Sequence, residues 1–253
     1  MKSKTKKTKQ HYLYGIHPVK EALVAQKRKI NQIFVNQHTR NPRLTEIEDI
    51  ASQKKIHMSY VSSAELKQIA GCEEHQHVVA QVSTLPLIDL QDLVSSHAFI
   101  IICDQIMDPH NLGAIIRTAL ASGATGLIMP KDNSTPLSST VSKVSAGAME
   151  HLPIARVTNL VRSIKLLKDA GIWIFGLDSK AKSSVYHVQF DENVGLVVGG
   201  EHKGIRRLIL ENCDQVVHIP QSGPLDSLNA SVAAGVAMYE VFRQRKYRGV
   251  NHD

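Results

Sequence analysis

The chain has 253 residues, of which 43% are hydrophobic and 21% are charged. These are ordinary values for a globular protein, and they exclude extended disorder and fibrous repeats. The formal net charge of +7 is compatible with an anionic partner such as nucleic acid. Five lysines in the first ten residues and four basic residues between 243 and 248 account for more than this excess. The two basic ends are therefore either solvated termini or phosphate-binding arms on a slightly acidic body.

The sequence also limits the compartment of the protein. Its longest strongly apolar run, residues 98–103, has six residues, whereas a membrane-spanning helix needs roughly 20. The first ten residues lack the apolar stretch of a secretory signal. Cys72, Cys103 and Cys213 are odd in number and widely spaced, which favours reduced thiols. We therefore expect a cytoplasmic protein that does not contact membranes.

Short helical and strand-like patterns alternate over residues 11–83. In chain order they predict a helix over 17–28, a strand over 30–35, a helix over 43–53, a strand over 56–61, a helix that starts near Ser62, and a strand over 78–82. Ser62 and Glu65 have the spacing of a capping box, which marks a helix start. This pattern predicts a small α/β domain that follows a basic disordered tail (1–10) and precedes a linker (84–97).

A more regular pattern fills residues 98–253. Short runs rich in Ile and Val lie at 99–103, 126–129, 154–157, 172–177, 194–198 and 216–219, and helical segments separate most of them. Strands of this composition are typically buried on both faces. The pattern predicts an α/β domain with a mostly parallel sheet covered by helices on both sides.

The first segment with candidate functional residues is 104–123, directly after the first of these strands. Leu112, Ile115 and Ile116 belong to an apolar helical stripe that we expect to pack on the sheet. Asn111 lies at the helix start, where it is either a cap or a ligand contact. Arg117 lies off the stripe and is either solvated or functional. Helical spacing alone does not join these two side chains in one site.

The second segment, residues 195–204, has the sequence GLVVGGEHKG and predicts a strand that runs into a glycine-rich turn. Glycines let the backbone approach a ligand closely, although a tight structural turn also needs them. The turn matches neither the dinucleotide-binding pattern nor the phosphate-loop pattern. Glu201 within it either accepts hydrogen bonds from a ligand or faces water.

The third segment, residues 217–241, contains small residues at helical spacing. Ser227, Ser231 and Gly235 recur every four residues and predict a helix face that a neighbouring backbone or a ligand can approach closely. Tight internal packing is the alternative. Ser227 and Asn229 are also candidates for ordinary helix caps.

Taken together, the three segments resemble the SpoU family of RNA ribose 2′-O-methyltransferases, and most closely its members that act on a guanosine of 23S rRNA. Each fragment is short, but their order and separation make the combination specific, and further matches at 14–17, 75–76 and 150 extend it over nearly the whole chain. The turn departs from the family at His202, where relatives commonly have glycine. The matching residues are Asn111, Leu112, Gly113 and Arg117, then Gly199, Glu201 and Gly204, then Ser227, Leu228, Asn229, Ser231, Val232 and Ala233.

The resemblance implies a SPOUT-type α/β fold, in which a C-terminal domain with a deep trefoil knot follows a small N-terminal RNA-recognition domain. It implies S-adenosyl-L-methionine as methyl donor, no metal, a homodimer, and 23S rRNA or its assembly precursor as partner. Carried over by position, the cofactor would rest on backbone at Gly199, Ile219 and Leu228, and the reaction centre would be lined by Asn111, Arg117, Glu201, Ser227 and Asn229.

The implied reaction is methylation of a ribose 2′-hydroxyl, which is a poor nucleophile until its proton leaves or its developing charge is stabilised. In this family the motif arginine, which is Arg117 here, is assigned as the base. Since guanidinium groups stay protonated in proteins, we expect Arg117 to act mainly through electrostatics and positioning, and the proton acceptor stays open. Methylation of tRNA and a non-catalytic RNA-binding role in ribosome assembly are the alternatives, and the intact motif residues argue against the second.

Overall fold

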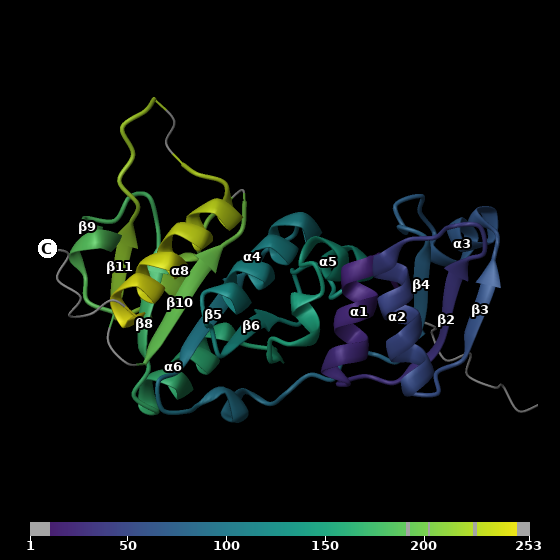
Figure 1. Ribbon diagram of the computed structural model, residues 1–253. Coiled ribbons are helices and arrows are strands. Elements are labelled where there is room, and N and C mark those ends of the chain that lie inside the picture. Colours follow the sequence, from purple (N-terminus) through teal and green to yellow (C-terminus); the bar gives the residue numbers. More distant parts are fainter. Residues whose placement is uncertain (1–10, 191–192, 202, 225–226, 247–253) are drawn as a thin grey trace, which may run out of the picture. The chain divides into compact units, whose positions relative to one another are not determined.

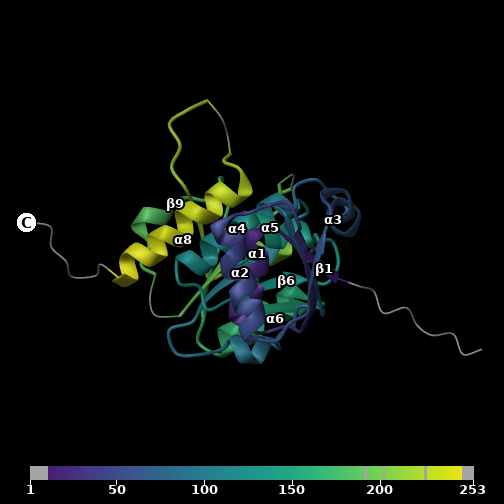
Figure 2. The ribbon, with the colours of Figure 1, turned by 45° about the vertical axis from the view of Figure 1, so that its right-hand side comes forward.

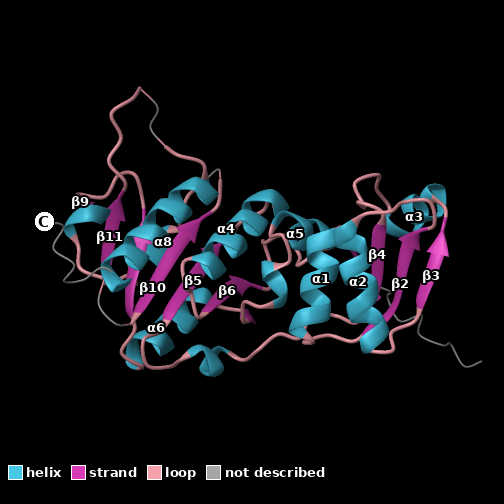
Figure 3. Cartoon of the chain, viewed as in Figure 1, coloured by secondary structure: helices cyan, strands magenta, loops and turns pink. Residues whose placement is uncertain are grey.

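A computed structural model of the chain describes residues 11–190, 193–201, 203–224 and 227–246. The chain divides into two compact units, with the boundary between Pro86 and Leu87. Figure 1 and Figure 3 show the elements of each unit. The predictions made for the basic tail (1–10) and for His202 fall outside the described residues.

The smaller unit is a four-stranded mixed sheet with three helices. Its strand order is β1-β4-β2-β3, in which β4 is antiparallel to β1 and β2, and β2 is parallel to β3. Buried apolar side chains from the sheet and from two helices, among them Leu23, Ile33 and Ile47, form one core. The elements are β1 (His11–Tyr14), α1 (Ile16–Ala25), β2 (Ile30–Asn36), α2 (Pro42–Gln53), β3 (Met58–Val61), α3 (Ser63–Ala70) and β4 (Val78–Val82).

The elements predicted for this part of the chain are confirmed, with two differences. Strand β1 has no predicted counterpart, because its four residues, HYLY, form neither a run rich in Ile and Val nor a clear polar–apolar alternation. Helix α1 ends at Ala25, about one turn before the predicted end, since Gln26 adopts a left-handed conformation with φ 53°. The predicted capping box is present, because the side chains of Ser62 and Glu65 each accept a hydrogen bond from the other residue's backbone N–H.

The larger unit contains a seven-stranded sheet in the order β7-β6-β5-β10-β8-β11-β9. Within this sheet, every strand pair between described residues is parallel. This confirms the predicted mostly parallel sheet. The order reverses beside β5, which has β6 on one side and β10 on the other. The strands are β5 (Phe99–Asp104), β6 (Gly126–Pro130), β7 (Ile154–Val157), β8 (Trp173–Leu177), β9 (Ser183–Ser184), β10 (Val194–Gly199) and β11 (Gln215–His218).

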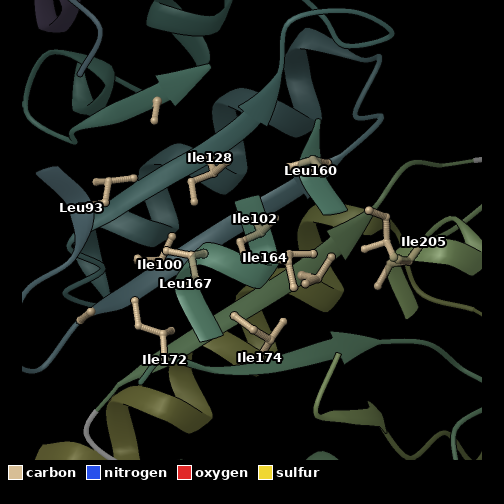
Figure 4. Packing of buried hydrophobic residues seen from close by; sticks show 14 residues of the cluster. Leu93, Ile100, Ile102, Ile128, Leu160, Ile164, Leu167, Ile172, Ile174 and Ile205 are labelled. Atoms are coloured by element: carbon tan, nitrogen blue, oxygen red, sulfur yellow. The ribbon is translucent and has the colours of Figure 1, made fainter. Parts of the chain in front are cut away.

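Helices cover this sheet. Helices α4 and α8 pack against each other and lie side by side in Figure 1 and Figure 2. Leu160, Ile164 and Leu167 from α6 pack with Ile100 and Ile102 of the sheet in one core, which Figure 4 shows. None of the helices in the described ranges is long and apolar enough to cross a membrane. The helices are α4 (Pro109–Ala121), α5 (Ser139–Val144), α6 (Leu160–Asp169), α7 (Arg207–Leu210) and α8 (Ala230–Lys246), with 3₁₀ helices at Leu90–Leu93, Ala148–Glu150 and Val185–His187.

The segment expected to be a linker contains the first of these 3₁₀ helices. Leu93 at its end is buried in the core of the larger unit. The backbone N–H of Ile88 donates a hydrogen bond to the carbonyl oxygen of Ile154 at 3.1 Å. The second half of this segment is therefore packed onto the larger unit.

Two of the basic residues near the C-terminus take part in the fold. Arg243 donates hydrogen bonds of 2.7 and 2.8 Å to the carboxylate of Glu240. Arg245 donates to the carbonyl oxygen of Ala98 at 3.0 Å, and its guanidinium lies 5.1 Å from the centre of the Phe99 ring. Both guanidinium groups therefore have partners within the described residues, although the Arg243 side chain is 61% exposed.

Two helical glycines allow a test of the packing around α4. A Cβ at Gly113 in α4 would lie 2.6 Å from Cβ of Val144 in α5, whereas a Cβ at Gly235 in α8 would come no closer than 3.7 Å to Thr118. Alanine is favoured over glycine within a helix by about 1 kcal/mol, but overpacking costs about 1–3 kcal/mol. We expect urea denaturation to show a lower free energy of unfolding for Gly113→Ala and an equal or higher one for Gly235→Ala. Equal effects in both variants would contradict the close α4–α5 contact.

Candidate active site

A pocket of about 580 Å³ opens at the carboxyl edge of the parallel sheet. Ligands of open α/β sheets bind at this edge, beside the point where the strand order reverses. The volume lies within the range of small-molecule sites. The pocket wall comes from the ends of β8, β10 and β11, from the turns that follow them and from the start of α8. Its residues are Leu177, Asp178, Ser179, Lys180, Val198, Gly199, Gly200, Glu201, Lys203, Gly204, Val217, His218, Ile219, Gln221, Ser227, Leu228, Asn229, Ala230 and Ala233.

Most of the predicted site residues come together here. Asn111 does not line the pocket but is hydrogen-bonded to two residues that do. Arg117 is neither in the wall nor bonded to it. The predicted residues in the wall are Gly199, Glu201, Ile219, Ser227, Leu228 and Asn229.

The turn after β10 requires glycine for steric reasons. The N–H of Gly204 donates to the carbonyl oxygen of Gly200 at 3.0 Å, which closes the turn. A Cβ at Gly199 would lie 2.2 Å from the backbone carbon of Gly204, and a Cβ at Gly200 would lie 2.2 Å from the backbone oxygen of Gln105. A larger residue does not fit at either position. Backbone groups rather than side chains therefore form this part of the pocket wall.

Asn111 connects the three sequence segments. Its side-chain Nδ2 donates to Oε1 of Glu201 at 2.7 Å, and its Oδ1 accepts from Nδ2 of Asn229 at 3.1 Å. Asn111 is 7% exposed, whereas Glu201 and Asn229 are exposed, so both bonds are partly shielded from water. The amide is thus held in one orientation beside the pocket.

The carboxylate of Glu201 accepts hydrogen bonds from several donors. Partial burial alone raises the pKa of Glu201, but hydrogen bonds from the Asn111 side chain and from the N–H groups of Met107 and Asp108 outweigh it, so the pKa is lowered from its ordinary value. The group is therefore ionised at neutral pH and accepts hydrogen bonds only. For this reason Asn111 must turn its NH₂ group, not its oxygen, toward Glu201.

Asn229 is both a helix cap and a member of this network. Its Oδ1 accepts hydrogen bonds from the N–H of Ser231 at 2.9 Å and from the Ser231 hydroxyl at 2.7 Å, at the start of α8. Its Nδ2 remains available to Asn111. Helix α8 begins at Ala230, so Ser227 precedes the helix and is not part of the predicted small-residue face.

Arg117 lies elsewhere on α4. It follows Asn111 by six residues, which places the two side chains roughly 120° apart around the helix and about 9 Å apart along it. The side chain is exposed, and no hydrogen bond or ion pair joins it to another described residue. Within one chain, Arg117 is therefore outside the pocket.

The described residues hold no group of three or more His, Cys, Asp or Glu side chains placed to bind a metal ion. Burial raises the pKa of Cys103 to about 12, with a further increase from Asp104. Burial and the neighbouring Asp214 raise the pKa of Cys213 to about 12 as well. Both thiols are protonated at neutral pH and do not supply a thiolate nucleophile.

Part of the wall consists of residues that the sequence does not single out. Leu177 ends β8, residues 178–180 follow it, and His218 ends β11. Both strands lie beyond β10 in the sheet. These residues lie at or just after the ends of predicted strands. That position indicates a pocket residue only when the strand order is known.

Comparison with known proteins identifies the family. The model of the SpoU rRNA methylase family matches residues 98–239, and the model of the RNA 2′-O ribose methyltransferase substrate-binding region matches residues 12–87. The chain is 40% identical over 240 residues to the 23S rRNA (guanosine-2′-O-)-methyltransferase RlmB of Xanthomonas campestris, covering 92% of this chain and 96% of that protein. It is also 40% identical over 245 residues to YacO of Bacillus subtilis, a putative TrmH family tRNA/rRNA methyltransferase, with 94% and 98% covered.

Solved structures agree with these matches. The SpoU methyltransferase AviRb from Streptomyces viridochromogenes, in complex with the cofactor AdoMet, aligns with a TM-score of 0.80 at 25% identity and covers 93% of this chain and 90% of that one. A crystal structure of an RNA 2′-O ribose methyltransferase aligns with a TM-score of 0.79 at 26% identity, with 93% and 89% covered. The resemblance seen in the three sequence segments is thus confirmed, and the chain belongs to the SpoU rRNA methylase family.

Proposed function

We propose that the chain methylates a ribose 2′-hydroxyl of RNA with S-adenosyl-L-methionine as donor, at a guanosine of 23S rRNA or of its assembly precursor. The observation that carries the proposal is the joining of Asn111, Glu201 and Asn229 beside a pocket with a backbone wall. Several relatives that match over nine-tenths of the chain are named 23S rRNA guanosine methyltransferases. A ribosomal substrate places the protein in the cytoplasm.

The residues proposed to hold the cofactor are Gly199, Ile219 and Leu228, through their backbone groups. The turn after β10, residues 199–204, is called the glycine turn below. It fits this role, because side chains do not cover its backbone and a Cβ at Gly199 has no room. Ala233 adds a small apolar side chain to the same wall. When bound, S-adenosyl-L-methionine would supply a methyl group that its sulfonium already activates. The chain then needs to position the acceptor hydroxyl, whose proton leaves to Arg117 or to water, but not to form a covalent intermediate.

The network around Asn111 prepares the reaction centre before RNA binds. Its amide is held by Glu201 on one side and Asn229 on the other, and groups fixed in advance do not have to reorganise during a reaction. Ser227 lies in the pocket wall next to these groups. In this proposal these four residues hold the acceptor ribose in place, and Arg117 stabilises the negative charge that forms on its oxygen.

Because Arg117 lies outside the pocket of its own chain, we assign it to the pocket of a second subunit in a homodimer. Exposed apolar side chains lie on α4, the helix of Arg117, and on α8, which packs against it, namely Leu120 on α4 and Val232 and Tyr239 on α8. Apolar side chains exposed together on one surface are typical of protein interfaces. A dimer formed through α4 and α8 would cover them and could bring the partner subunit's Arg117 to the acceptor ribose.

The remaining parts of the chain follow the same proposal. Residues 11–83 bind the RNA substrate, in keeping with the substrate-binding model that matches 12–87, residues 84–97 connect the domains, and residues 98–253 are the methyltransferase domain with the trefoil knot. The tail (1–10) adds phosphate contacts through its lysines.

The cofactor site can be tested by calorimetry with S-adenosyl-L-methionine. We expect the wild-type chain to bind it and Ala233→Leu to bind it at least about tenfold more weakly, because the larger side chain fills part of the pocket, and tenfold corresponds to 1.4 kcal/mol. Ala121→Leu, which adds the same group at an exposed position of α4, should bind as the wild type does. A folded wild-type chain that binds no S-adenosyl-L-methionine would refute methyl transfer and favour the non-catalytic assembly factor.

The role of Arg117 can be tested by subunit complementation. Arg117→Ala should lower turnover about 100-fold or more, as the loss of one group that stabilises transition-state charge typically does, and leave S-adenosyl-L-methionine affinity unchanged. Mixing this variant with Ala233→Leu under conditions of subunit exchange should restore part of the activity, because each mixed dimer contains one complete site. Arg162→Ala, at another exposed helical arginine, should behave as the wild type. No restoration in the mixture would contradict an Arg117 supplied across a dimer interface.

The substrate can be identified by mapping ribose methylation in total RNA from cells with and without the gene. We expect one guanosine of 23S rRNA to lose its 2′-O-methyl group in the deletion strain and to regain it when the wild-type gene is restored. Restoration with the Arg117→Ala gene should leave the position unmodified. A change confined to tRNA would instead establish the tRNA alternative.

A further inference from the structure

A completely buried carboxylate lies next to the pocket but outside its wall. Asp104, the last residue of β5, is 0% exposed. Its Oδ2 accepts a hydrogen bond from the backbone N–H of Arg206 at 2.9 Å. Its Oδ1 accepts from Nε of the same arginine at 2.9 Å and pairs with Nη2 at 2.7 Å. One side chain thus binds both the backbone and the guanidinium of Arg206.

Asp104 controls both ends of the glycine turn. In the pairing of β5 with β10, Asp104 stands opposite Gly199, the residue at which the turn begins. Arg206 is the residue at which the chain leaves the turn and enters α7. The strand register therefore fixes the entry of the turn, and the carboxylate of Asp104 fixes its exit.

The residues after Asp104 press against the same turn. A Cβ at Gly200 would lie 2.2 Å from the backbone oxygen of Gln105, and Gln105 has a left-handed φ of 59° that places the chain there. Met107 N–H donates to Glu201 at 3.5 Å. Displacement of Asp104 would therefore shift the turn at its exit and along its length.

We propose that Asp104 and Arg206 form a positioning pair that sets the shape of the glycine turn and thereby the affinity for the methyl donor. The inference rests on the proposed function, because it takes the turn to be a cofactor wall. Neither residue belongs to the pocket wall, so the pair acts through the backbone between Gly199 and Arg206.

A second ion pair at the opposite edge of the sheet provides a control of the same kind, although its carboxylate is 15% exposed and that of Asp104 is 0% exposed. Asp214 accepts the backbone N–H of Ile174 at 2.8 Å and pairs with Lys168 at 2.7 Å. It therefore makes the same kind of contacts as Asp104, namely one backbone N–H and one cation. It precedes β11, at the amino edge of the sheet, whereas the pocket lies at the carboxyl edge.

The experiment compares Asp104→Asn with Asp214→Asn by calorimetry with S-adenosyl-L-methionine and by urea denaturation. Both variants should be less stable than the wild type, because each leaves a cation without its partner. Only Asp104→Asn should bind the donor about tenfold or more weakly, the typical effect of losing a hydrogen bond to a charged group. Unchanged affinity in Asp104→Asn, or equal losses in both variants, would overturn the inference.

Variants of Arg206 provide the test if Asp104→Asn does not fold, since this side chain is 44% exposed. Arg206→Met should weaken donor binding, and Arg206→Lys should restore part of it, because lysine returns the positive charge. Equal affinity of Arg206→Met and the wild type would contradict the pair's role. A wild-type chain that binds no donor would instead refute the proposed function, and the inference with it.

Discussion

The side-chain amide of Asn111 is the interaction on which the arrangement of the site depends. It joins the start of α4 to the turn after β10 and to the start of α8, which lie 90 and 118 residues further along the chain. An amide has one accepting and one donating side, and here each side is assigned by its partner. The ionised carboxylate of Glu201 can only accept, so it takes the NH₂ group, and the oxygen then accepts from Asn229. Three loops are therefore held together by bonds that tolerate only one orientation of the amide.

These loops meet because of the strand order. Parallel strands bring their carboxyl ends to one edge of a sheet, and β10 lies between β5 and β8. The connection from β5 to α4 is thereby placed against the glycine turn that follows β10, where Gly200 touches Gln105. The end of β11 lies on the far side of β8 and completes the pocket. The position of β10 between β5 and β8 thus determines which segments meet at the carboxyl edge of the sheet.

The strands of the larger unit could be predicted from the sequence, because runs such as 99–103 and 194–198 are buried on both faces and rich in Ile and Val. Strand β9 could not, since its two residues are too few for a pattern, and in the smaller unit β1 could not, since HYLY is not rich in Ile and Val. The candidate residues of the three segments could be named from the sequence, each with a structural alternative, but only the family resemblance joined them in one site. The sequence does not reveal that Asp104 binds Arg206, because this contact depends on the strand order, and helical spacing alone does not join Arg117 to Asn111 in one site.

The buried polar groups of this edge contribute to geometry more than to stability. Taking Asp104 out of water carries a desolvation penalty that its ion pair with Arg206 only offsets, whereas the isoleucines of β5 lose no polar contacts when they are buried. Glycine has more conformational freedom to lose on folding than any other residue, and a turn built on Gly199, Gly200 and Gly204 has few side chains with which to fix itself. Two carboxylates therefore hold the turn. Glu201 accepts hydrogen bonds from the backbone N–H groups of Met107 and Asp108, and Asp104 accepts one from the backbone N–H of Arg206. The open backbone wall is thus held by two carboxylates, of which Glu201 is exposed and Asp104 is buried.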